Sequence, residues 1–450
     1  MSNDQQTSEN IYYVCCATAQ MQTNWQPLRE YHPKVIKGIL VLIGLSDLVN
    51  PTENDRTQAL APADHFERAV LNLGYPRPEK IQERAASFNG WPERVIDWIH
   101  RVNDTATTGS AFVIFNVTGG TKAMNCGAAR GLQQAIDSHG NLRLRLVYAA
   151  RGDVLHEQGC TQERRLPELG LEDFIALRGF DESLLERHNR VTYQAAVVQR
   201  EGMLFDLWQA IQTGLQVEPF TALAAAIIES QKIETNGFVR IERHNLEVSL
   251  RRKSQQTTIL LNILHQLCPI CTPNPSLDGP WLRFTNADDL ECSTNFGTWL
   301  QGHWLEELVF LRVRKLFAEN NQDSDRVCLG VKTHRIDENG ALLSVQSHEL
   351  DVAFVVGGLL HVIECKSDAS PSSKEKQIWM NRLIAIRTEL TGLHGRVGLL
   401  HPRIVIHPNG AHGRTAKKQD LSCWQGNTAL EELELAIQKY LQCTNHAGDP

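Results

Sequence analysis

Two short apolar segments separated by a pair of glycines give the clearest structural signal in this chain. Residues 350–356 and 359–365 are rich in Val, Ile, Leu and Phe, and Gly357 and Gly358 lie between them. Two adjacent glycines between β-forming segments are a strong signal for a two-residue hairpin turn. The sequence therefore predicts an antiparallel β-hairpin whose register is set by the turn.

That register determines which charged side chains meet. With Val356 opposite Leu359, Asp351 falls directly opposite Glu364, at a Cβ separation of roughly 5 Å. Two carboxylates this close repel each other unless a cation lies between them, and hard divalent cations prefer oxygen ligands. Lys366 follows Glu364 by two residues and shares its face of the strand. The hairpin thus predicts a divalent-metal site, with the lysine placed to position a water or to neutralise a phosphate.

A further carboxylate is expected from residues 302–310, which have the pattern of a helix. On that helix Glu306 shares an arc with Phe310, whereas Glu307 lies near Arg314. We therefore expect Glu306 to face the metal site and Glu307 to face solvent.

The pattern resembles the PD-(D/E)XK nuclease superfamily, which usually adds a Glu from an upstream helix to Asp…Glu-x-Lys. The resemblance implies a catalytic set of Glu306, Asp351, Glu364 and Lys366, in which Asp351, Glu364 and Glu306 bind Mn²⁺ or Mg²⁺. The alternative is that Asp351 is a polar residue at a strand end and that Glu364 and Lys366 form a surface ion pair. The metal site is favoured because these charges interrupt an otherwise apolar segment.

Composition sets limits on the rest of the chain. With 450 residues and a formal net charge of −7, the chain is long enough for two or three domains and has no global basic character. Any nucleic-acid contact must therefore come from a local patch. The N-terminus has no signal-peptide pattern, and the longest aliphatic run, residues 38–45, is too short to span a bilayer. We expect a soluble cytoplasmic protein without membrane contact, whose eleven cysteines are reduced.

Strand and helix patterns alternate through residues 1–155, which predicts an α/β fold with a parallel, doubly wound sheet. Strands are expected at residues 11–17, 38–45, 111–117 and 142–150, and helices at residues 81–102 and 122–136. Residues 156–294 are predicted to form a mixed connector and accessory subdomain, and residues 295–450 a restriction-endonuclease-like α/β domain.

The connector contains one candidate structural metal site. His265, Cys268 and Cys271, with Cys292 downstream, have ligand types and spacing that can bind zinc, although the second half of such a site is poorly formed. A basic run within residues 239–261 is interpreted as a solvated face in preference to a nucleic-acid contact.

A glycine-rich turn follows the third predicted strand. Gly119 and Gly120 let the backbone approach a ligand closely, and amides at a helix start suit a phosphate. Thr118 and Thr121 can donate hydrogen bonds, and Lys122 adds positive charge. The spacing of a Walker A loop is absent. Taken alone, the motif is also compatible with a simple turn that caps a helix.

In this position the turn resembles that of the CARF domain, the Rossmann-like sensor of CRISPR-associated proteins. In that family a strand–[ST]-G-G-T-[KR]–helix turn binds cyclic oligoadenylate, and the end of the first strand contributes to the pocket. The binding residues that the resemblance implies are Thr18, Gln20, Gly119, Gly120, Thr121 and Lys122.

A CARF domain followed by a PD-(D/E)XK domain resembles the CRISPR-associated nucleases activated by cyclic tetra-adenylate. The resemblance implies that cyclic tetra-adenylate is a messenger molecule, and that it binds a homodimer whose symmetry matches the symmetry of its ring. Messenger binding shifts the dimer towards an active state, in which a metal-dependent site cleaves DNA and/or RNA in type III CRISPR antiviral defence. The sequence leaves the choice between DNA and RNA open.

Three alternatives to this interpretation exist. The chain can be a CARF-type transcription regulator, with a DNA-binding module within residues 190–290 and an inactive nuclease domain. Residues 151–156 and 396–401 match the HEPN ribonuclease motif R-x-x-x-x-H. Both matches are interpreted as chance, since the first follows a strand end and the second has a strand pattern where a HEPN site needs a helix. Finally, the sensor domain can degrade its own messenger.

Overall fold

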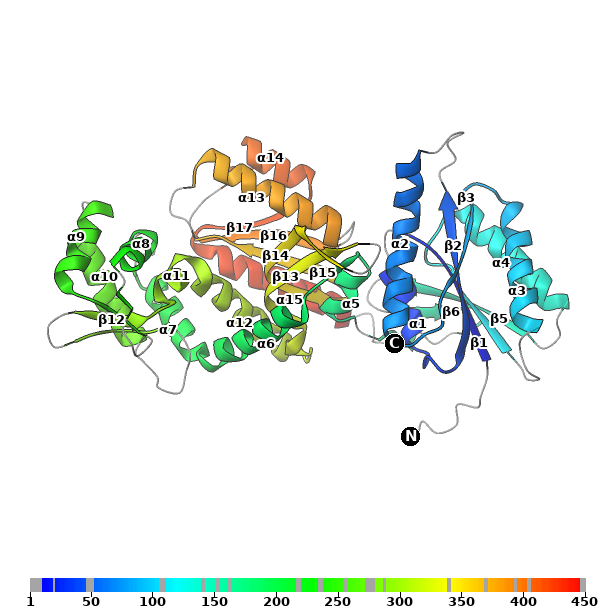
Figure 1. Ribbon diagram of the computed structural model, residues 1–450, viewed down its shortest axis with the longest axis horizontal. Helices are drawn as coiled ribbons and strands as arrows, with labels where there is room; N and C mark the ends of the chain where they lie inside the picture. Colours follow the sequence, from blue (N-terminus) through cyan, green and yellow to red (C-terminus); the bar gives the residue numbers. More distant parts are fainter. Residues whose placement is uncertain are drawn as a thin grey trace.

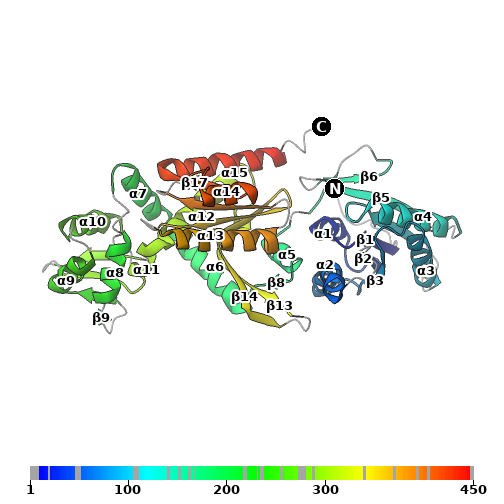
Figure 2. The same ribbon diagram turned by 90° about the horizontal axis from the view of Figure 1, so that it is seen from above.

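The computed structural model describes residues 10–18, 21–45, 52–104, 111–138, 142–150, 154–160, 164–167, 169–215, 220–230, 232–233, 238–253, 257–271, 280–285, 289–337, 341–367, 371–391, 395–402 and 406–445. Figure 1 shows three parts along the longest axis: an N-terminal sheet with its helices in blue and cyan, a second sheet in yellow to red, and a small green subdomain at the far end. Figure 2 shows the same order from above.

The N-terminal sheet is doubly wound, as predicted. Its strand order is β3-β2-β1-β4-β5-β6-β7, and the first five of these strands run parallel. The strands are β1 (Asn10–Cys16), β2 (Ile36–Leu45), β3 (Glu79–Arg84), β4 (Ala111–Asn116), β5 (Leu142–Ala150), β6 (Val154–Glu157) and β7 (Arg164–Arg165). The last two are antiparallel additions at the β5 edge.

Helices cover both faces of this sheet, which explains why its strands are nearly continuous apolar runs. Trp25 and Phe66 pack with Tyr13 on one face, and Trp91 and Met124 pack on the other. The helices of the first face are α1 (Gln22–Arg29) and α2 (Glu53–Asn72), and those of the second are α3 (Gly90–Asp104) and α4 (Lys122–Ser138). The prediction of a helix over residues 81–102 was wrong about where the helix starts. The first of these residues belong to β3, which pairs with β2, and the helix begins at Gly90.

The second sheet contains the predicted hairpin. Its strand order is β17-β16-β15-β14-β13-β8. The strands are β8 (Phe180–Asp181), β13 (Val327–Ile336), β14 (Leu342–Val356), β15 (Leu359–Cys365), β16 (Arg396–His401) and β17 (Ser422–Gln425). Gly357 and Gly358 have φ values of 56° and 68°, the conformation that a two-residue turn with two left-handed positions requires. Residues 396–401 lie in a strand, which excludes them as a helical HEPN motif.

Helices also cover both faces of the second sheet. Phe310 on α12 (Trp304–Glu319) and Leu433 on α15 (Ala429–Asn445) belong to the core that includes Phe354. The opposite face is covered by α13 (Ser373–Ile386) and α14 (Ala411–Lys418). Among the described residues, no helix is both long enough and apolar enough to cross a membrane.

The green subdomain is a small antiparallel sheet with helices. Its strand order is β11-β12-β10-β9, and two further helices link this region to the second sheet. Its elements are α8 (Phe220–Ser230), β9 (Lys232–Ile233), β10 (Phe238–Ile241), α9 (Arg243–Lys253), α10 (Thr257–Ile270), β11 (Leu282–Phe284) and β12 (Leu290–Ser293). The linking helices are α6 (Leu184–Gln199), which packs on β13, and α7 (Glu201–Gln212), which packs on α12.

The candidate zinc ligands have packing roles in this subdomain. Cys271 and Cys292 are buried in its core, and in the part of the chain that the structure describes no three His, Cys, Asp or Glu side chains gather into a metal-binding set. The ring of His265 stacks on Phe284, with 4.2 Å between centroids.

Candidate functional site

The hairpin register places two carboxylates together. The ladder between β14 and β15 runs from Val356–Leu359 to Val352–Ile363, and the next step in this register places Asp351 across from Glu364. The Oδ2 atom of Asp351 accepts a hydrogen bond of 2.8 Å from the backbone amide at position 365. The predicted hairpin register is therefore confirmed as far as the Val352–Ile363 pair, and the turn chemistry is its cause.

Two cations lie against these carboxylates. Lys366 Nζ lies 2.6 Å from Oε1 of Glu364 and 3.3 Å from Oδ2 of Asp351, and it donates to the carbonyl oxygen of Cys365 at 2.9 Å. Arg382, from α13, lies 3.1 Å from Oε1 of Glu364 and 4.0 Å from Oδ1 of Asp351. Arg382 could not be predicted from the sequence, because only the docking of α13 on the sheet brings it to the hairpin.

Burial makes the electrostatics of this cluster strong. The side chain of Glu364 is fully buried and that of Asp351 is 7% exposed, so solvent screens them little. Burial and the Asp351 charge raise the pKa of Glu364, against the opposing effect of Lys366. Burial alone lowers the pKa of Lys366, but Asp351 and Glu364 more than offset this and raise it. Lys366 is therefore held as a cation partner of both carboxylates in this arrangement.

Glu306, which was predicted to complete the cluster, lies near it at the start of α12. It lines a cavity of about 190 Å³ together with Gln301, His303, Lys366 and Ser367. Burial, followed by the Asp351 charge, raises the pKa of Glu306 well above its usual range. The cavity therefore lies between the end of β15, at Cys365 and Lys366, and the start of α12.

Glu307 contradicts the prediction that it faces solvent. Its side chain is fully buried and accepts hydrogen bonds from Tyr193 Oη (2.5 Å), from Arg200 Nη2 and Nε (2.5 and 3.1 Å) and from Trp299 Nε1 (3.1 Å). The physical reason is a second layer of structure: α7 packs on α12, and Tyr193 of α6 and Arg200 between α6 and α7 reach the Glu307 carboxylate. Glu306 and Glu307 therefore have different environments on one helical turn.

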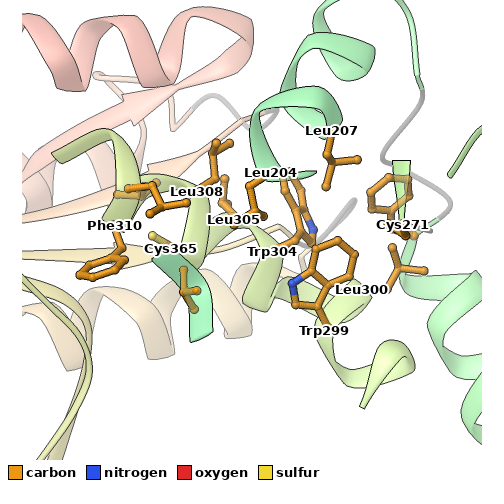
Figure 3. Close-up of a cluster of buried hydrophobic side chains, with 14 of the residues drawn as sticks. Leu204, Leu207, Cys271, Trp299, Leu300, Trp304, Leu305, Leu308, Phe310 and Cys365 are labelled. Carbon is orange, nitrogen blue, oxygen red and sulfur yellow. The ribbon is translucent and has the colours of Figure 1, made fainter. Parts of the chain in front are cut away.

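The tryptophans near the site are core residues. Figure 3 shows Trp299 and Trp304 among Leu204, Leu207 and Leu300, and both indoles are at most 2% exposed. Trp304 also packs edge-on against Phe220, at 5.9 Å. Their role is to fix the start of α12, and with it the position of Glu306, and not to stack on nucleic-acid bases.

The donor atoms of the hairpin fit a hard divalent cation. Asp351 and Glu364 offer only oxygen, and Oε2 of Glu364 is buried without a hydrogen-bond partner within the described part of the chain. Across the described residues, no three His, Cys, Asp or Glu side chains gather into a metal-binding set, so Glu306 does not join the two hairpin carboxylates in this conformation.

The predicted messenger-binding residues converge on the end of β1. A Cβ added to Gly119 would lie 2.7 Å from Cγ2 of Thr18, so turn and strand end are in direct contact. Gly120 has a φ of 81° and packs on Cys16, which leaves space for no larger residue. Gln20 lies outside the described residues.

The remaining turn residues lie at the start of α4. The hydroxyl of Thr121 accepts from the amide of Met124 at 3.2 Å and donates to the carbonyl of Ala85 at 3.0 Å. Thr121 therefore caps the helix and ties it to the end of β3. Lys122 is exposed beside it.

A buried amide network that the sequence analysis missed holds this turn. Asn116 donates to Asn24 Oδ1 (3.1 Å) and to Tyr13 Oη (3.1 Å), and its Oδ1 accepts from the hydroxyl of Thr118 at 2.6 Å. The same hydroxyl accepts from the amide of Ala149 at 2.7 Å. The hydroxyl of Thr118 therefore makes its hydrogen bonds within the fold, and not to a ligand as the sequence suggested. The sequence signal for this network is Asn116 itself, a polar residue at the end of a buried strand.

Comparison with known proteins matches one part of the chain to a family model. Residues 294–414 match the family model described as "Card1-like, endonuclease domain", which confirms the predicted endonuclease domain. No curated protein sequence matches significantly.

Two solved structures share the fold over nearly the whole chain. Protein VC1899 from Vibrio cholerae superposes with a TM-score of 0.66 at 16% identity, covering 96% of this chain and 98% of that one. Can2 from Sulfobacillus thermosulfidooxidans, solved in complex with cyclic tetra-adenylate, has a TM-score of 0.58 at 15% identity, covering 96% and 99%. At these identities the likeness is one of fold.

Proposed function

We propose that this protein is an endonuclease that cyclic tetra-adenylate activates and that cleaves DNA and/or RNA with a divalent metal in type III CRISPR antiviral defence. One observation carries the proposal: within the matched endonuclease domain, the hairpin brings Asp351, Glu364 and Lys366 together in a buried cluster. The fold shared with Can2, solved with cyclic tetra-adenylate, supports the sensor half.

The residues of the hairpin have different roles in the proposed reaction. Asp351 and Glu364 would hold Mn²⁺ or Mg²⁺, and Glu306 would join them or bind a water beside them. Such an ion lowers the pKa of a bound water and stabilises the charge that develops on the phosphate. Lys366, which pairs with both carboxylates, would neutralise the phosphate oxygens. The cavity beside Glu306 and His303 gives the scissile phosphate its access.

The sensor half works through the end of the N-terminal sheet. Ligands of doubly wound sheets bind at the carboxyl ends of the strands. Here Thr18, Gly119, Gly120 and Lys122 lie at that edge, beside the start of α4, where helix amides favour phosphate. We propose that two chains form a homodimer around one ring messenger, so that the messenger shifts the dimer towards its active state.

The test is a cleavage assay on single-stranded RNA, single-stranded DNA and supercoiled plasmid with Mn²⁺, with and without cyclic tetra-adenylate. We expect cleavage that requires the messenger and is lost in Glu364→Gln. Glu389→Gln is the matched control, because Glu389 pairs with His348 away from the hairpin carboxylates. Cleavage that survives in Glu364→Gln would refute the site. Sequence-specific duplex binding without cleavage would favour a transcription regulator.

A further inference from the structure

Arg382 occupies an unusual position for an arginine on a surface helix. It extends from α13 to the hairpin, where it contacts Glu364 at 3.1 Å and Asp351 at 4.0 Å, and it also donates to the backbone carbonyl of Glu349. Its side chain is 34% exposed, so one end of it reaches solvent. The helix is fixed at its start by a capping box between Ser372 and Glu375. Arg382 is therefore held at the boundary between the carboxylate cluster and the surface.

The charges of the cluster explain what this arginine does in the absence of metal. Asp351 and Glu364 are buried side by side, and Lys366 alone offsets one of their two negative charges. Arg382 supplies the second positive charge. A divalent cation at the same carboxylates supplies two positive charges by itself and repels a guanidinium that shares Oε1 of Glu364. Metal and Arg382 therefore compete for one place.

Of the two cations, Arg382 is the one that can leave. Lys366 is 19% exposed, lies next to the end of the hairpin strand and also donates to the Cys365 carbonyl. Arg382 is more exposed and is attached to a helix that packs on the sheet from outside. A guanidinium released at the edge of a nuclease site has five donors in a planar fork, which matches phosphate oxygens.

We propose that Arg382 stands in for the metal in the metal-free protein, is displaced when a divalent cation binds, and then contacts a phosphate of the nucleic-acid substrate. This inference rests on the proposed nuclease function and deepens it. It gives one side chain two successive partners, the carboxylates of the protein and the phosphate of the substrate. A purely structural ion pair has the first partner but not the second.

The test compares Mn²⁺ binding by the full-length wild type, Arg382→Gln and Arg382→Lys, measured by calorimetry without messenger or nucleic acid. We expect Arg382→Gln to bind Mn²⁺ more tightly, by up to about tenfold, because the competing charge is gone. Arg382→Lys, which keeps the charge, should remain close to wild type. Arg387→Gln is the control, since Arg387 pairs with Asp420 outside the cluster. Weaker or unchanged binding in Arg382→Gln would overturn the proposal.

The phosphate contact has a separate readout. With Mn²⁺ saturating, both Arg382→Gln and Arg382→Lys should cleave more slowly than wild type, about tenfold or more, since lysine cannot make the bidentate contact. Wild-type cleavage in both variants would overturn this half. Absence of Mn²⁺ binding in the wild type and in Arg382→Gln alike would refute the metal site of the proposed function. Tight binding in the wild type without a gain in Arg382→Gln would refute the role of Arg382 alone.

Discussion

The guanidinium of Arg200 lies 2.5 Å from the carboxylate of Glu307, and both side chains are almost completely shielded from solvent. The pair joins the boundary between α6 and α7 to the first turn of α12, where Tyr193 also donates to the same carboxylate. The preceding residue, Glu306, faces the cavity of the candidate site. Residues far from the hairpin in sequence therefore fix the helix that presents Glu306.

We expect Glu307→Ala to lower the free energy of unfolding by about 3–5 kcal/mol, because the change leaves the Arg200 guanidinium buried without its partner. Denaturant unfolding followed by circular dichroism measures this. Glu306→Gln is the matched control on the neighbouring residue, and it should unfold at close to the wild-type denaturant concentration. Equal stability of Glu307→Ala and wild type would show that the buried pair makes no net contribution.

This pair also shows where prediction from the sequence ends. The hairpin was predictable because its information is local: two glycines with left-handed φ values sit between apolar strands and set the register of Asp351 and Glu364. The environment of Glu307 is not local, because its partner Arg200 lies 107 residues earlier in the chain. A helical arc indicates which residues share a face, but not how many layers cover that helix.

Asp351→Asn should abolish Mn²⁺ binding and reduce cleavage by at least about 100-fold while the protein stays folded. The fold survives because an amide oxygen can still accept the hydrogen bond from the backbone at position 365. Calorimetry with Mn²⁺, paired with the cleavage assay, measures both effects. Asp325→Asn, at an exposed position in the same domain, should change neither. Undiminished Mn²⁺ affinity in Asp351→Asn would remove this residue from the metal site.

Gly120→Ala should weaken binding of cyclic tetra-adenylate and cost about 1 kcal/mol of stability or more, because alanine is strained at a φ of 81° and its methyl would lie 2.8 Å from Cys16. Gly159→Ala is the control in the same part of the chain: its φ is 84°, but no atom lies within 4 Å of the added methyl. It should lose some stability and keep its messenger affinity. Titration of each variant with the messenger measures its binding affinity. A loss of affinity in Gly120→Ala alone would distinguish damage to the turn from the effect of backbone strain.

The sensor turn itself was predictable in type but not in detail. Its glycines and Thr121 follow the expected strand–turn–helix order, and Gly119 does contact Thr18. The role of Asn116 could not be predicted, because its partners Tyr13 and Asn24 come from β1 and α1 and depend on how β1 and β4 pair. A polar residue at the end of a buried strand indicates that a hydrogen-bond network exists, but it does not indicate which residues are the partners.

Stability at acidic pH should depend on His361. The imidazole is buried against Phe354 and Tyr440, neither ring nitrogen has a hydrogen-bond partner within the described residues, and burial, with a smaller effect of Arg396, lowers its pKa to about 3. The unfolded chain binds a proton near pH 6.5, which the folded protein resists, so stability falls as the pH falls from about 6.5 towards 3.

His361→Phe removes this effect and keeps the stacked ring, so it should raise the unfolding midpoint more at pH 5 than at pH 8. Thermal unfolding of wild type and variant at the two pH values measures the difference. His188→Gln, at an exposed position on α6, should show no such dependence. A gain in His361→Phe that is the same at both pH values would show that the folded protein protonates His361 as readily as the unfolded chain does.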